Sequence, residues 1–124
     1  MKLGIIRGYD AAAFDFVKGK GLDFIEVCTN FDNESEAFIA SVDDIRANID
    51  RTGVPVLSVG RWNSTPNAGG KANPEIMDML KRQIDATAKI GCPVFNMGVN
   101  YCEELSLYRN YEFAISCLRE MVEY

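Results

Sequence analysis

The chain has 124 residues, of which 48% are hydrophobic and 25% charged, and it is large enough to bury the core of one domain. Its net charge is −5 and its pI is near 4.7, which argues against nucleic acids and anionic membrane surfaces as partners. It contains no histidine.

The amino-terminal residues lead directly into an apolar segment, without the pattern of a secretory leader, and no apolar run is long enough to span a bilayer. The cysteines show neither C-x-x-C spacing nor the density of a disulfide scaffold. We therefore expect a cytoplasmic protein with reduced thiols. The cysteines are Cys28, Cys92, Cys102 and Cys117.

Four apolar segments predict β-strands, over residues 2–8, 22–29, 54–62 and 94–99. The last of them is nearly all apolar, which is typical of a strand buried on both faces of a parallel sheet. In the other segments, polar and apolar side chains alternate with the period of a strand. This alternation predicts that Glu26, Ser58 and Asn96 point away from the helices, and that Ile25, Val27, Leu57, Val59, Phe95 and Met97 point toward them.

Helical patterns separate these strands. Asp10 can cap a first helix, whose inner face carries Phe14 and Val17. The polar segment 30–36 (NFDNESE) is expected to be a loop, and a second helix is expected over residues 41–53, where Ser41 and Asp44 resemble a capping pair and Gly53 ends the helix.

A turn-rich loop over residues 63–72 leads to the third helix, which Asn73 can cap and which Pro74 can begin. Gly91 is expected to end it in a left-handed conformation. A fourth helix begins near Ser106 and continues to the last residue. Its inner face is expected to carry Leu107, Tyr111, Ala114, Leu118 and Met121 or Val122.

Strands that alternate with helices predict an α/β fold with four successive βα units, a parallel sheet and right-handed crossovers. We expect one domain over residues 1–124. Four units are half of a TIM (β/α)8 barrel, which usually needs about 250 residues. The fourth helix stops at Tyr124 without a glycine or a polar tail, and the favoured interpretation is a barrel truncated after its fourth unit. A frayed terminal helix of a self-contained sheet is the alternative.

The candidate site lies at the carboxyl ends of the strands, where parallel sheets and barrels build their sites. Two arginines there can clamp a phosphate or carboxylate, and a tryptophan can form an apolar wall against a sugar ring. Alternatively, Glu26 can form a buried ion pair with Arg7 or Arg61. The amide of Asn96 can be an interior group whose hydrogen bonds are all made within the protein. The candidate substrate-binding residues are Arg7, Glu26, Arg61, Trp62, Asn63, Asn96 and Asn100.

Two segments carry a resemblance. The DFIE sequence at Asp23–Glu26 resembles a second strand that ends in glutamate, and the ATAKIGCP sequence at Ala86–Pro93 resembles the junction of the third helix and fourth strand. Together with the order of the units, they are similar to the sugar-phosphate isomerase/epimerase family of xylose-isomerase-like TIM barrels, in its N-terminal half only. The resemblance implies an isomerase or epimerase that acts on a sugar or sugar phosphate with a divalent metal ion.

In that family the metal ligands lie on the later strands, so no metal ligand and no catalytic residue is assigned to this chain. Two other functions are alternatives. An abasic-site endonuclease of the same barrel group is disfavoured by the lack of histidine and by the acidic pI. A non-catalytic half-barrel that acts as an interaction module remains open. Whichever function applies, we expect the exposed edge strands of the half-barrel to be covered, either by a second copy in a homo-oligomer or by a missing C-terminal half.

Overall fold

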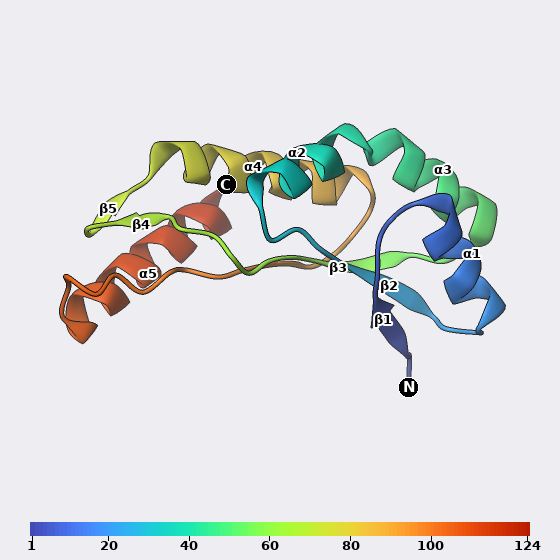
Figure 1. Ribbon diagram of the computed structural model, residues 1–124, viewed down its shortest axis with the longest axis horizontal. Helices are drawn as coiled ribbons and strands as arrows, with labels where there is room; N and C mark the ends of the chain where they lie inside the picture. Colours follow the sequence, from blue (N-terminus) through green and yellow to red (C-terminus); the bar gives the residue numbers. More distant parts are fainter.

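The computed structural model describes residues 1–124 and contains a four-stranded parallel sheet (Figure 1). Its strands are β1 (Gly4–Ile6), β2 (Phe24–Cys28), β3 (Val56–Arg61) and β6 (Phe95–Met97). They are ordered β1-β2-β3-β6, and every neighbouring pair is parallel. The predicted parallel sheet of four successive βα units is therefore confirmed.

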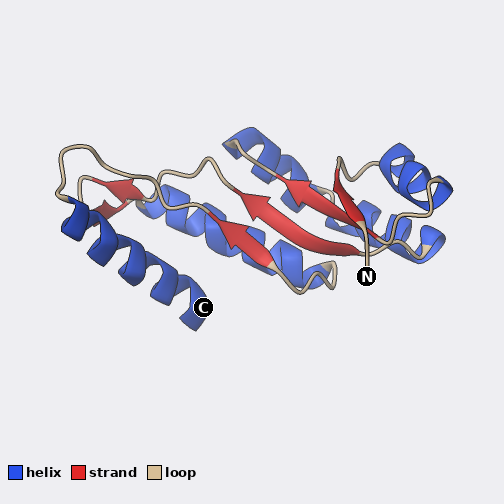
Figure 2. Cartoon of the chain, turned by 90° about the horizontal axis from the view of Figure 1, so that it is seen from below, coloured by secondary structure: helices blue, strands red, loops and turns tan.

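Five helices follow or connect these strands. Figure 1 shows α2, α3 and α4 along one side of the sheet, and in Figure 2 the strands lie in front of this helical layer with no helix covering their near face. None of the helices is both long and apolar enough to cross a membrane. The helices are α1 (Ala11–Gly19), α2 (Asp32–Ala40), α3 (Val42–Thr52), α4 (Pro74–Lys89) and α5 (Leu107–Glu123).

The predicted helix ends are present. The side chain of Asp10 accepts a hydrogen bond from the backbone N of Ala13 at 2.8 Å, and that of Asn73 accepts from the backbone N of Glu75 at 3.2 Å. Gly91 has φ = 73°, a left-handed conformation that glycine adopts without steric cost. These local signals fix where the helices begin and end.

The prediction of a loop over residues 30–36 was wrong, because α2 begins at Asp32. The Glu34 side chain accepts from the backbone N of Asn30 at 2.7 Å and of Phe31 at 3.3 Å, which satisfies amides at the start of the helix. Ser41 does not cap α3 as predicted. Its hydroxyl donates to the carbonyl of Ala37 at 2.8 Å and so belongs to the last turn of α2.

The main core lies between the sheet and the helices above it. It contains Phe14, Val17, Ile25, Val27, Phe38, Ile45, Val54, Val56, Val59, Ala86, Ile90 and Cys92. Its composition corrects one detail of the predicted alternation. A register irregularity between Ile25 and Glu26 pairs Ile25 with Val56 and Glu26 with Ser58, so Val56 enters the core and Leu57 does not.

Two predictions about the carboxyl-terminal half were wrong. Strand β6 is only partly buried, because no helix covers the near face of the sheet in Figure 2 and because β3 is its only neighbour. Helix α5 buries Asn110, Phe113, Cys117 and Met121, not the predicted stripe. Met121 is the one member of that stripe that is buried, in a second, smaller cluster with residues of α4. The rest of the stripe faces solvent, apart from the half-buried Ala114.

The loop between β3 and α4 contains an element that the sequence did not indicate. Strands β4 (Asn67–Ala68) and β5 (Lys71–Ala72) form a short antiparallel hairpin. Its turn residues Gly69 and Gly70 both have positive φ, of 63° and 84°. The hairpin lies beside the start of α5 at one end of the molecule (Figure 1).

Candidate functional site

The face of the sheet opposite the helices carries a row of polar side chains, Glu26, Ser58 and Asn96, which we call the axial row. Glu26 lies directly opposite Ser58 on the neighbouring strand. The Asn96 amide nitrogen donates to the Ser58 hydroxyl at 2.8 Å. All three side chains are half-buried. The predicted placement of these residues on the face away from the helices is borne out by this register.

Trp62 covers the carboxyl end of the same face. Its indole nitrogen lies over Gly60, where an added Cβ would come within 2.7 Å of it. Gly60 pairs with Cys28 on one side and with Asn96 on the other, so the indole is next to the axial row. The side chain remains 53% exposed. The half-exposed indole therefore places an apolar surface beside hydroxyl, amide and carboxylate groups.

Cys28 lies on this face under the indole. Burial raises the pKa of its thiol; a hydrogen bond with Trp62 opposes this shift, and the charges of Glu26 and Glu34 add to it. The thiolate fraction at neutral pH is consequently smaller than that of a free cysteine, and Cys28 is suited to packing and hydrogen bonding more than to nucleophilic attack.

This environment gives a measurable expectation. Cys28 is the partly exposed cysteine, and the other three are buried. In the folded chain a thiol reagent should modify Cys28 first, more slowly at pH 8 than in the unfolded chain, with a rate that rises as the pH approaches the raised pKa. Peptide mapping by mass spectrometry across a pH series checks both points. Preferential modification of Cys92 or Cys117 would contradict the placement.

The two arginines do not converge on a ligand. Arg61 is buried beneath α2, where its guanidinium donates to Asp32 Oδ1 at 2.5 Å and to Ser35 Oγ at 2.6 Å. Arg7 stacks over the Phe16 ring at 3.9 Å from the ring centroid. Neither forms the ion pair with Glu26 that the sequence allowed. Arg61 cannot reach Glu26 because side chains alternate along a strand. Arg61 follows Val59 by two residues, so both side chains point toward the helices.

The two remaining predicted residues behave differently from each other. Asn63 is exposed after β3. The Asn100 side chain accepts from the backbone N of Asn67 at 2.8 Å and donates to its carbonyl at 3.0 Å, which ties the β4–β5 hairpin to the loop after β6. Asn67 and Asn110 extend this connection and were not predicted. Their side chains are joined at 3.2 Å, and Asn110 also accepts from the backbone N of Cys102 at 2.8 Å.

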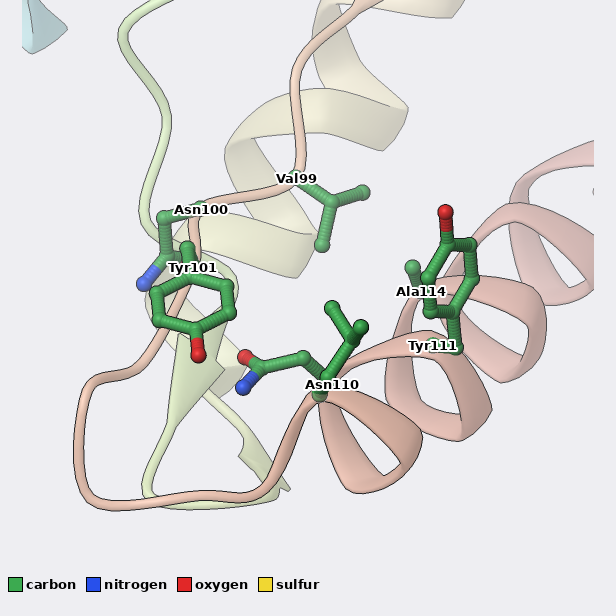
Figure 3. Close-up of a pocket in the computed structure, with 7 residues that line it drawn as sticks. Val99, Asn100, Tyr101, Asn110, Tyr111 and Ala114 are labelled. Carbon is green, nitrogen blue, oxygen red and sulfur yellow. The ribbon is translucent and has the colours of Figure 1, made fainter.

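A hollow of about 240 Å³ lies between the loop after β6 and the first turns of α5. Figure 3 shows the loop residues on one side of it and the helix residues on the other. Its walls are mostly apolar, and its two amides are already engaged with protein groups. It therefore has the character of an unfilled packing surface. The lining residues are Val99, Asn100, Tyr101, Leu107, Asn110, Tyr111 and Ala114.

The side chains present do not fit a divalent metal ion. No group of three or more histidine, cysteine, aspartate or glutamate side chains comes together anywhere in the 124 residues. The axial row offers one carboxylate, from Glu26, together with an amide and a hydroxyl. Protein metal sites normally use three or more such ligands, so no step of a reaction is assigned to a metal in this chain.

Four parallel βα units with helices on one side of the sheet, and a polar row on the other, define half of a (β/α)8 barrel. No protein-family model and no curated protein sequence matches the chain, but solved structures do. The apo 3-keto-D-glucoside 4-epimerase of E. coli matches with a TM-score of 0.73 and 17% identity, over 98% of this chain and 50% of the epimerase.

A xylose isomerase domain protein from Planctomyces limnophilus matches with a TM-score of 0.57 and 13% identity, over 95% of this chain and 48% of that protein. The chain thus has the fold of half of a TIM barrel, as the sequence predicted. It spans about half the length of the solved structures it resembles.

Proposed function

We propose that this chain supplies half of the substrate-binding wall of a sugar or sugar-phosphate isomerase or epimerase. The observation that carries the proposal is the axial row beside Trp62, on the face that lines the interior of a closed barrel. One of the solved structures with this fold is named for epimerisation of a 3-keto-D-glucoside, and another is named as a xylose isomerase domain protein.

The axial row has the groups that a sugar needs. The free Glu26 carboxylate can accept hydrogen bonds from two neighbouring hydroxyls, and the Ser58–Asn96 pair offers both donors and acceptors. The exposed face of Trp62 can pack against the C–H groups of a sugar ring. These residues bind and orient the substrate in this proposal. Proton transfer beside a carbonyl and any metal ion are assigned to residues outside the chain, because those present do not form a metal site.

The completed site requires either a second copy of the chain or a complementary half-barrel. We also propose a reducing compartment such as the cytoplasm, since all four cysteines are free. A non-catalytic interaction module is the second candidate, and the exposed apolar stripe of α5 favours it.

Sugar binding can be followed through Trp62, the only tryptophan of the chain. We expect a saturable change in its fluorescence with a 3-keto-D-glucoside or with D-xylose, and none with sorbitol, an open-chain polyol. Asn96→Leu should weaken the binding roughly tenfold, the effect of losing one or two hydrogen bonds. Asn33→Leu, on the exposed surface of α2, is the matched control and should leave the affinity unchanged. Equal responses to the sugars and to sorbitol would contradict the proposal.

A further inference from the structure

Helix α5 has two apolar faces, and only one of them is covered. Phe113, Cys117 and Met121 pack against α4. The second face, which we call the α5 stripe, is between 44% and 86% exposed along the whole helix. Soluble proteins seldom leave so continuous an apolar surface in water. The α5 stripe consists of Leu107, Tyr111, Ile115, Leu118 and Val122.

The α5 stripe lies where a further β-strand belongs. In a (β/α)8 barrel each helix packs over its own strand and the next one, and β6 has β3 as its only neighbour. The other edge of β6 has unpaired backbone groups, which can accept a parallel strand. The hollow lined by Val99 and Leu107 continues the same uncovered surface from the loop to the helix (Figure 3).

We propose that the strand that fills this position is β1 of a second copy of the chain. Strand β1 is the other edge of the sheet, since it pairs only with β2. It runs parallel to β6, so a rotation about the barrel axis brings β1 of one copy beside β6 of the other with the correct polarity. Two copies supply eight strands, and closure of the barrel removes every exposed edge.

The side chains of β1 suit this position. Ile5 faces the helices and packs against the main core, and Leu3, two residues earlier, has the same orientation but is 59% exposed. In the dimer Leu3 of one copy comes under the α5 stripe of the other. The two-fold axis repeats this contact, so both uncovered helices and both uncovered strand ends are buried together.

The second copy also completes the binding site. Each copy contributes one axial row, and the two rows face each other across the barrel interior. What the completed site binds rests on the function proposed above. The assembly itself depends on the strand edges and the α5 stripe, so it can be tested without any sugar.

Sedimentation velocity and light scattering across the micromolar range test the assembly. We expect the wild-type chain to form a particle of twice the 13.8 kDa monomer mass. Ile115→Lys places a charge in the α5 stripe and should give folded monomers. Ser116→Lys adds the same charge at the adjacent exposed position, on a different face of α5, and should leave the dimer intact.

A complementary pair tests the contact itself. Leu3→Glu should also give monomers, and an equimolar mixture of Leu3→Glu with Ile115→Lys should restore dimers, because one contact then pairs the glutamate with the lysine and the other is unaltered. Circular dichroism confirms that each variant is folded. A wild-type chain that is folded but monomeric would overturn the proposal and favour a strand from a longer polypeptide. Dimers that survive Ile115→Lys, or particles larger than two copies, would overturn it as well.

Discussion

Replacement of Arg61 by alanine is expected to cost the fold about 3 kcal/mol, because it truncates a buried side chain that joins β3 to α2. The Arg61 side chain is 3% exposed and holds Ser35 and Asp32 of α2 against the end of β3. Its loss leaves the buried Ser35 hydroxyl without this donor and opens a space beneath the helix. Urea unfolding monitored by circular dichroism measures the change.

Two further variants distinguish the loss of the buried Arg61 side chain from the loss of a positive charge in general. Arg51→Ala removes an ion pair with Asp15 whose side chains are both about half exposed, and it should cost less than about 1 kcal/mol. Arg61→Met keeps most of the buried stem and should recover part of the loss. Equal stability of the Arg61→Ala and Arg51→Ala variants would contradict the structural role of Arg61.

The second large effect is expected for Gly98→Ala. An added Cβ at Gly98 would lie 2.6 Å from the carbonyl oxygen of Trp62, and a backbone atom cannot rotate away as a side chain can. Gly98 is also held in place, because its N donates to the carbonyl of Arg61 at 2.9 Å and its carbonyl accepts from Ser64 Oγ at 2.6 Å. We expect a loss of about 2 kcal/mol, the usual cost of overpacking, and a displaced Trp62.

Urea unfolding gives the stability of this variant, and the emission maximum of Trp62 reports its displacement before unfolding. Gly8→Ala is the matched control. No atom lies within 4 Å of a Cβ added there and its φ is not positive, so its stability should stay within a few tenths of a kcal/mol of the wild type. A Gly98→Ala variant with unchanged stability and emission would show that β3 and β6 can separate without cost at this point.

The order of the strands and most helix ends could be predicted because they depend on local signals. Asp10, Asn73 and Gly91 act through the few residues next to them, and the alternation of apolar segments is enough to indicate parallel βα units. Helix α2 was missed for the opposite reason. Its sequence is polar, and it is stabilised by Glu34 at its start and by the burial of Phe38 against other elements.

The candidate site was predicted in part. Glu26 and Asn96 were placed correctly because the strand period alone decides their side of the sheet. The same period, applied to Arg7 and Arg61, would have put both on the helix side, away from the axial row. The strand period could not predict that Val56, and not Leu57, lies in the core, because a register irregularity cannot be recognised from a single sequence. For α5, both apolar faces are visible in the sequence, and only the neighbouring elements decide which one is covered.

The division of the apolar residues into two clusters bears on how the molecule opens. The larger cluster joins the sheet to α1, α2, α3 and the end of α4. Helix α5 is held by the smaller cluster, by the hydrogen bonds of Asn110, by the Lys81–Glu120 ion pair and by a hydrogen bond from Tyr124 to Asp85. So small a set of contacts gives α5 a lower free energy of local opening than the sheet has. We therefore expect α5 to open locally while the rest stays folded, so that the helix can adjust its position in the proposed dimer.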